Sequence, residues 1–278
     1  MTRPPAAVLA LLLVAATGCK KEEGTATMPT SQLPQLADVD SASWARLAQR
    51  RIFFGHQSVG QNIMDGVAEV VTANPHIRLL VVETKDIDAM RAPGLYHGRV
   101  GRNAHPSEKE AEFASIAGGA FSSAPGVGMV KLCYVDVGPD TDPAALFDSY
   151  QRRMAELSAR HPGLTLVHVT MPVTTSESTR GYWKNKLLGR RTARDLNAIR
   201  NKYNALLRAA YVGHAPVFDL AALESTRADG SRAFFRRGAD SVFTLAEEYT
   251  SDGDHLNDAA RRMVAERFLI FLATLPGS

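Results

Sequence analysis

Short, nearly continuous apolar runs alternate with longer amphipathic segments along most of this 278-residue chain. The runs lie at residues 51–54, 77–83, 128–137, 164–170 and 216–219. A strand that is apolar at consecutive positions is covered on both faces, and strands that alternate with helices form parallel βαβ units. The pattern therefore predicts an α/β fold with about five parallel strands between two layers of helices.

The segments between these runs carry apolar residues at the spacing of a helix. We predict helices at residues 59–73, 107–121, 143–160, 193–211 and 257–275. In sheets of this kind, ligands bind outside the carboxyl ends of the strands. Residues that directly follow a predicted strand are therefore the first places to look for chemistry.

The N-terminal segment is typical of a secretory signal. Arg3 precedes an apolar stretch at residues 6–16, and small residues at 16–18 lead directly into Cys19. A small-residue run that ends in cysteine resembles the lipobox of bacterial lipoproteins. An ordinary signal peptide with an incidental cysteine is the alternative interpretation.

On the lipoprotein interpretation, residues 1–18 are removed and Cys19 is acylated, which anchors the chain to a membrane. The polar segment that follows, to about residue 40, is expected to be a flexible tether, so that the lipidated residue and tether span 19–40. Residues 41–278 then fit a single domain. Lys20 after the cysteine favours the outer membrane of the cell envelope, by resemblance to Gram-negative sorting.

Charge and cysteine usage narrow the functional classes. The formal net charge of +3 is too small to predict nucleic-acid binding. Basic residues gather at 184–194 and 232–237, which indicates either a solvated face or contact with an anionic glycan or lipid.

Cys133 lies in an apolar run and is expected to be a lone buried thiol once Cys19 is acylated. No metal-ligand spacing or nucleotide motif is found, so no cofactor is predicted.

The sequence GHQSVGQNI follows the first predicted strand and places Ser58 at the turn into a helix. A hydroxyl there faces the positive end of the helix dipole and free N–H groups, which favour a developing negative charge. A helix N-cap is the alternative role for this serine. His56, two residues earlier, is interpreted either as a contact to an oxyanion or substrate, or as a cap on the strand end.

The sequence TSDGDHLND precedes the last predicted helix. Asp252 and His255 are three residues apart, and Gly253 permits a sharp turn between them. Such a turn can return the carboxylate to one imidazole nitrogen and leave the other nitrogen free as a base. The alternatives are a turn with an exposed histidine, or aspartates at 254 and 258 that cap the helix.

Together, a serine after the first strand and Asp-x-x-His before a C-terminal helix resemble the SGNH (GDSL-type) hydrolase superfamily, over about residues 51–275. The resemblance implies a flavodoxin-like, three-layer α/β/α fold. It also implies Ser58 as nucleophile, His255 as general base and Asp252 as the acid that orients the histidine. In this family the oxyanion donors are the serine N–H, a glycine after a middle strand and an asparagine.

The sequence departs from the family pattern at several blocks. The first block is HQS in place of GDS, and no asparagine follows residues 128–137, where Asp136 stands instead. An ionised aspartate there would repel an oxyanion. Gly101 for a backbone N–H and Asn103 for a side-chain donor, both in GRVGRNAHP, are the best substitutes.

The resemblance and the leader together predict an envelope-anchored serine esterase or deacylase. Its expected substrates are O-acyl esters of carbohydrates or other small envelope esters, and we expect a monomer that uses no cofactor. An O-acyltransferase with the same triad is one alternative. The missing asparagine and Asp136 support another, a non-catalytic lipoprotein that binds a glycan. A periplasmic solute-binding protein is disfavoured. Such proteins usually have two similar lobes, and the single series of alternating strands and helices in this chain is enough for one lobe.

Overall fold

The computed structural model describes residues 34–276. The expected signal peptide, the expected lipidation site Cys19 and the first part of the expected tether lie outside these residues. Within the expected tether, Leu36–Asp38 forms a 3-10 turn, and Leu36 and Val39 pack against the core. Among residues 34–276, no helix is long and apolar enough to cross a membrane.

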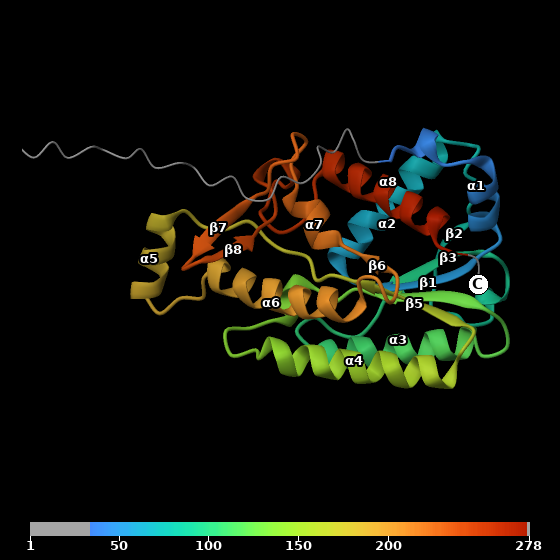
Figure 1. Cartoon of the computed structure of the whole chain (residues 1–278), viewed down its shortest axis with the longest axis horizontal. Helices are drawn as coiled ribbons and strands as arrows, with labels where there is room; N and C mark the ends of the chain where they lie inside the picture. Colours follow the sequence, from blue (N-terminus) through green and yellow to red (C-terminus); the bar gives the residue numbers. More distant parts are fainter. Residues whose placement is uncertain (1–33, 277–278) are drawn as a thin grey trace, which may run out of the picture.

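A six-stranded sheet forms the centre of the molecule, in the order β2-β3-β1-β4-β5-β6 (Figure 1). Every neighbouring pair is parallel. The strands are β1 (Arg51–His56), β2 (Val81–Glu83), β3 (Gly94–Arg99), β4 (Gly126–Val130), β5 (Leu164–Val169) and β6 (Val217–Phe218). The predicted α/β class with a parallel sheet is confirmed, with six strands where about five were expected.

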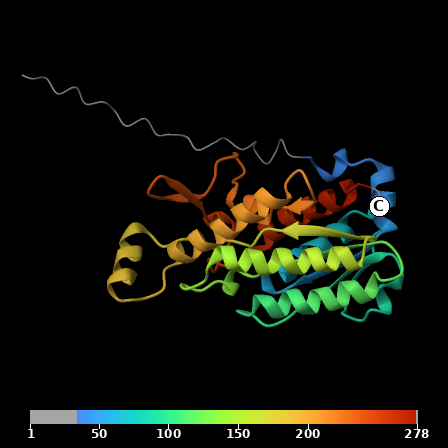
Figure 2. The same cartoon turned by 60° about the horizontal axis from the view of Figure 1, so that its bottom comes forward.

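Helices cover both faces of the sheet. On one face lie α1 (Ser41–Ala48), α2 (Ser58–Ala73), α7 (Leu220–Ser225) and α8 (Asp258–Thr274). On the other lie α3 (Pro106–Ala120), α4 (Pro143–Arg160) and α6 (Ala193–Tyr211). Figure 2 shows α3 and α4 side by side in front of the sheet. The three-layer architecture follows from this arrangement.

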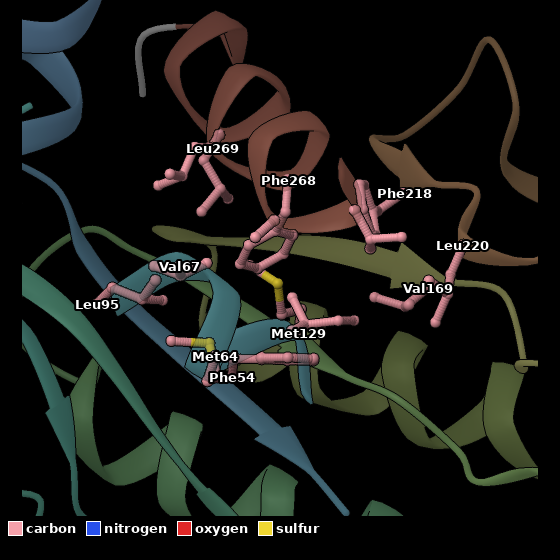
Figure 3. Close-up of a cluster of buried hydrophobic side chains, with 14 of the residues drawn as sticks. Phe54, Met64, Val67, Leu95, Met129, Val169, Phe218, Leu220, Phe268 and Leu269 are labelled. Atoms are coloured by element: carbon pink, nitrogen blue, oxygen red, sulfur yellow. The ribbon is translucent and has the colours of Figure 1, made fainter. Parts of the chain in front are cut away.

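The two hydrophobic cores explain why the strands are apolar at consecutive positions. In β1, Ile52 and Phe54 enter the core under α2 and α8, whereas Phe53 enters the core under α3 and α4. Figure 3 shows Phe54 and Met129 from the sheet facing Phe268 of α8. Burial on both faces therefore fixes β1 in the middle layer, with its carboxyl end two residues before Ser58.

Two parts of the sheet differ from the expectation. The strand β3 lies within residues 84–106, where no strand was predicted, and the two glycines of its sequence, GLYHGR, weaken the local signal for a strand. Five of its six residues are buried between β1 and β2. β4 ends at Val130 rather than at residue 137, because Asp136 accepts the Cys133 N–H (2.6 Å) and turns the chain into a 3-10 helix, Tyr134–Asp136.

A second unpredicted region lies at the end of the molecule far from α1 (Figure 1). It contains α5 (Thr179–Leu187) and the antiparallel hairpin of β7 (Phe234–Arg237) and β8 (Asp240–Phe243). The two basic segments of the sequence meet here, around a pocket of about 230 Å³ lined by Tyr182, Trp183, Arg194, Asp195, Phe235, Arg236 and Arg237.

Candidate active site

The turn between β1 and α2 presents Ser58. Gln57 is the N-cap residue and accepts the first helical hydrogen bond from Gln61 N–H (2.9 Å). Its side chain donates to the carbonyl oxygens of Val100 (2.8 Å) and Gly101 (2.9 Å), which ties the turn to the segment after β3. The N-cap role considered for Ser58 is therefore wrong: Ser58 is the first helical residue, and its hydroxyl is free to face another group.

That group is His255. The Ser58 hydroxyl oxygen lies 3.0 Å from His255 Nε2, although the two residues are 197 positions apart. On the other side of the ring, His255 Nδ1 lies 2.8 Å from Asp252 Oδ2. An ionised carboxylate only accepts hydrogen bonds, so Nδ1 carries the proton and Nε2 keeps its lone pair for the serine hydroxyl. The structure thus brings the three predicted residues into one line.

The turn that carries Asp252 is fixed by its own carboxylate. Asp252 Oδ1 accepts the backbone N–H groups of Asp254 (2.9 Å) and His255 (2.8 Å). These two bonds and the bond from the His255 ring hold the pKa of Asp252 well below its usual range, so the carboxylate is ionised. His255 is therefore not an unpartnered histidine on a surface turn, and Asn257, rather than an aspartate, caps α8 by accepting Ala260 N–H (3.0 Å).

Gly253 anchors this turn to the loop after β5. Its φ of +92° lies in the left-handed region, and its carbonyl accepts the Thr175 N–H at 2.9 Å. A Cβ atom at Gly253 would lie 2.8 Å from Thr175 Oγ1. Both the backbone conformation and the close approach therefore favour glycine between Asp252 and His255.

His56 does not face the site. Its side chain is fully buried, with Nδ1 3.0 Å from the Gln57 carbonyl and Nε2 3.0 Å from His97 Nδ1. Burial lowers the pKa of His56 to about 3, so the ring is neutral. A Cβ at Gly60 would come 2.2 Å from the His56 Cβ, so only glycine fits there in the first turn of α2. The proposed contact of His56 with an oxyanion or substrate is therefore wrong.

The two substitutes for the oxyanion donors have other partners. The Gly101 N–H donates to Glu112 Oε2 (2.7 Å), which removes it as an oxyanion donor and corrects that prediction. Asn103 is exposed, and its carbonyl oxygen accepts from Lys109 Nζ (3.1 Å). That bond fixes the amide and leaves its NH₂ group as the end able to donate.

The charge of Asp136, which was expected to repel an oxyanion, is paired with a lysine. Both of its carboxylate oxygens accept from Lys109 Nζ, at 2.6 and 2.7 Å, and both side chains are fully buried. The carboxylate also accepts the Ala104 N–H at 3.0 Å, where Ala104 has a left-handed φ of +65°. The ion pair neutralises the charge and holds the 101–104 loop against the turn after β4, so the expected repulsion of an oxyanion is wrong.

One site residue escaped the sequence analysis. The hydroxyl of Tyr134 lies 3.4 Å from His255 Nε2, and the two rings meet edge to face with centroids 5.7 Å apart. Tyr134 sits in the run CYVDV, which was assigned to a buried strand, so its side chain was not considered for the site. Its neighbour Cys133 is a buried free thiol, as expected.

Among residues 34–276, no group of three or more histidine, cysteine, aspartate or glutamate side chains is placed to hold a metal ion.

The first turn of α2 supplies hydrogen-bond donors beside the Ser58 hydroxyl. The N–H groups of Ser58, Val59 and Gly60 precede the first intrahelical bond and have no partner within the helix. The site thus combines a serine hydroxyl in contact with a histidine base and backbone N–H donors at a helix N-terminus.

No protein-family model and no curated protein sequence matches the chain. Solved structures do match at low identity. A carbohydrate acetylesterase from Sinorhizobium meliloti is 11% identical, with a TM-score of 0.43 over 82% of this chain and all of that one. A lipase/acylhydrolase from Enterococcus faecalis is 12% identical, with a TM-score of 0.42 over 81% of this chain and 95% of that one. The aryl esterase of M. smegmatis is 13% identical, with a TM-score of 0.41 over 82% of this chain and all of that one. These likenesses concern the fold alone.

Proposed function

We propose that this protein is a serine hydrolase that cleaves carboxylic esters. The observation that carries the proposal is the continuous line of contacts from Ser58 through His255 to Asp252, at 3.0 and 2.8 Å. A serine hydroxyl is a weak nucleophile until a neighbouring base takes its proton, and a third group must hold that base in the correct tautomer. Ser58 is positioned by the turn between β1 and α2, and His255 and Asp252 by the turn before α8.

In the proposed first step, Ser58 Oγ attacks the ester carbonyl and its proton passes to His255 Nε2. The carbonyl oxygen becomes an oxyanion beside the N–H groups of Ser58 and Val59, where the positive end of α2 also stabilises it. The NH₂ group of Asn103, held by Lys109, is the candidate side-chain donor. Collapse releases the alcohol and leaves an acyl-serine, which water hydrolyses by the reverse sequence of proton transfers.

The proposed substrates are O-acyl groups of carbohydrates or other envelope esters. Two features support this class: the predicted lipobox at Cys19, which would tether the domain to the outer membrane, and the accessibility of the site. Ser58 is half-buried, and the side chain of His255 is 35% exposed. An open site of this kind admits an acyl group on a bulky molecule. The buried Lys109–Asp136 pair also removes the charge that favoured a purely binding role.

A fluorophosphonate probe tests the proposed chemistry. The probe reacts with a serine only when a base activates the hydroxyl, so we expect one adduct per chain, on the peptide that contains Ser58. Intact and peptide mass spectra of residues 20–278, with and without the probe, measure it. Absence of an adduct at high probe concentration would contradict the proposal and favour the non-catalytic, glycan-binding alternative.

A further inference from the structure

Tyr134 places a hydrogen-bond donor at the centre of the proposed reaction. Its hydroxyl lies 3.4 Å from His255 Nε2, the same nitrogen that Ser58 Oγ approaches to 3.0 Å. A neutral imidazole nitrogen has one lone pair, and the shorter contact with the serine occupies it. Within the part of the chain that the structure describes, the Tyr134 O–H has no other acceptor, so it is a donor directed at the position of the reacting atoms.

Arg200 holds the backbone and the ring of Tyr134 in place. Arg200, which is 3% exposed, donates from Nε to the Tyr134 carbonyl at 3.0 Å and lies with its guanidinium carbon 5.7 Å from the ring centroid. Arg200 is itself held by Thr174 Oγ1 (2.9 Å) and Asn197 Oδ1 (2.7 Å). The phenol therefore needs no rearrangement to act during the reaction, which is the condition for efficient electrostatic stabilisation.

The phenol is also in the protonation state that a donor requires. Burial, together with the negative charges of Asp254 and Asp252, raises the pKa of Tyr134 to about 12. The hydroxyl consequently keeps its proton throughout the neutral range. It can donate a hydrogen bond to a developing anion without releasing the proton.

We propose that Tyr134 donates a hydrogen bond to the leaving oxygen of the ester. The site is consequently suited to esters of alkyl or sugar hydroxyls rather than to esters of acidic phenols. This inference rests on the proposed function. In the tetrahedral intermediate the leaving oxygen must approach His255 Nε2 to take the proton that came from Ser58. The Tyr134 hydroxyl lies 3.4 Å from that nitrogen. On this proposal it is next to the leaving oxygen, and the former carbonyl oxygen faces the N-terminus of α2.

The step balances without a further reactant. The bond between Ser58 Oγ and the acyl carbon stays, and the oxyanion's electron pair re-forms the carbonyl double bond. The bond from that carbon to the leaving oxygen breaks, and His255 Nε2 gives its proton to that oxygen. Tyr134 keeps its own proton. The benefit depends on how basic the leaving oxygen is: an alkoxide gains much from a donor, and a nitrophenolate, which is already stable, gains little. Esters of alkyl or sugar hydroxyls are therefore the favoured class.

Tyr134→Phe tests this inference, because it removes the hydroxyl and keeps the ring against His255. The measurement is kcat/KM, which reports the steps through acylation, for acetate esters of p-nitrophenol, phenol, trifluoroethanol and ethanol. We expect a loss of about ten- to hundredfold for the ethyl ester, the range of a hydrogen bond to a charged group. The loss for the p-nitrophenyl ester is expected to stay below about threefold. Tyr96→Phe, which removes a hydroxyl bonded to the Ala92 carbonyl (3.1 Å), is the matched control.

Two results would overturn the assignment. Equal losses for all four esters would place the phenol at the oxyanion or in a purely positioning role on His255. Unchanged kcat/KM for all four would reduce Tyr134 to packing. Failure of the proposed function is a separate outcome, because hydrolysis by the wild-type protein would then persist in Ser58→Ala.

Discussion

Replacement of Ser58 by alanine is expected to lower kcat/KM for p-nitrophenyl acetate by at least about 10⁴-fold, the scale seen when a catalytic nucleophile is removed from a serine hydrolase. The reason is the loss of the one oxygen that His255 Nε2 can activate at 3.0 Å. Alanine is favourable in a helix, and the side chain of Ser58 makes no capping bond, so α2 should form unchanged.

The measurement needs a fold control and a matched serine. Thermal unfolding of Ser58→Ala should give the wild-type midpoint, which separates lost chemistry from lost structure. Ser158→Ala alters an exposed serine near the end of α4 and should retain full activity. Residual activity within about tenfold of the wild type in Ser58→Ala would remove this serine from the mechanism, on the same scale of effects.

Asp252→Asn is expected to lower kcat by about 10⁴-fold through the tautomer of His255. Two backbone N–H groups, from Asp254 and His255, require an acceptor at the Oδ1 position. The asparagine oxygen therefore stays there, and its NH₂ group faces His255 Nδ1. That nitrogen must then accept, which moves the ring proton to Nε2 and prevents it from taking the proton of Ser58.

Asp258→Asn is the matched control for this variant. The Asp258 side chain is 90% exposed and pairs with Arg261, away from the histidine, so the same chemical change should leave kcat unaltered. Asp252→Asn should also retain the fold, because the turn keeps its acceptor. A loss of less than about tenfold in Asp252→Asn would mean that the carboxylate does not govern the base.

The parts predicted well from the sequence are those that local residues determine. Continuous apolar runs identified the central strands, and helical spacing placed α4 and α6 at their observed bounds. The Asp-x-x-His spacing with an intervening glycine predicted a turn that returns the carboxylate to the ring, which is the geometry observed. Ser58 followed from its place after the first strand. In each case the signal lies within a few residues of sequence, even though the partner of Ser58 is 197 positions away.

The parts that were missed depend on contacts between distant residues. β3 is a strand because β1 and β2 enclose it, although its glycines weaken the local signal. Asp136 looked repulsive in isolation, because its partner Lys109 is 27 positions away. Tyr134 was hidden in an apolar run, since only the fold turns it toward His255. Pairings of this kind leave no pattern in a single sequence.

The most direct test of the central claim is to trap the acyl group itself. The protein is mixed with p-nitrophenyl acetate, quenched in acid within the first turnovers and digested, and the peptides are analysed by mass spectrometry. A nucleophilic serine that His255 and Asp252 activate must carry the acyl group before water removes it. We therefore expect an acetyl group on Ser58, present in the wild type and absent in Ser58→Ala. Hydrolysis of the ester with an acetyl group on another residue, or with none, would contradict the account.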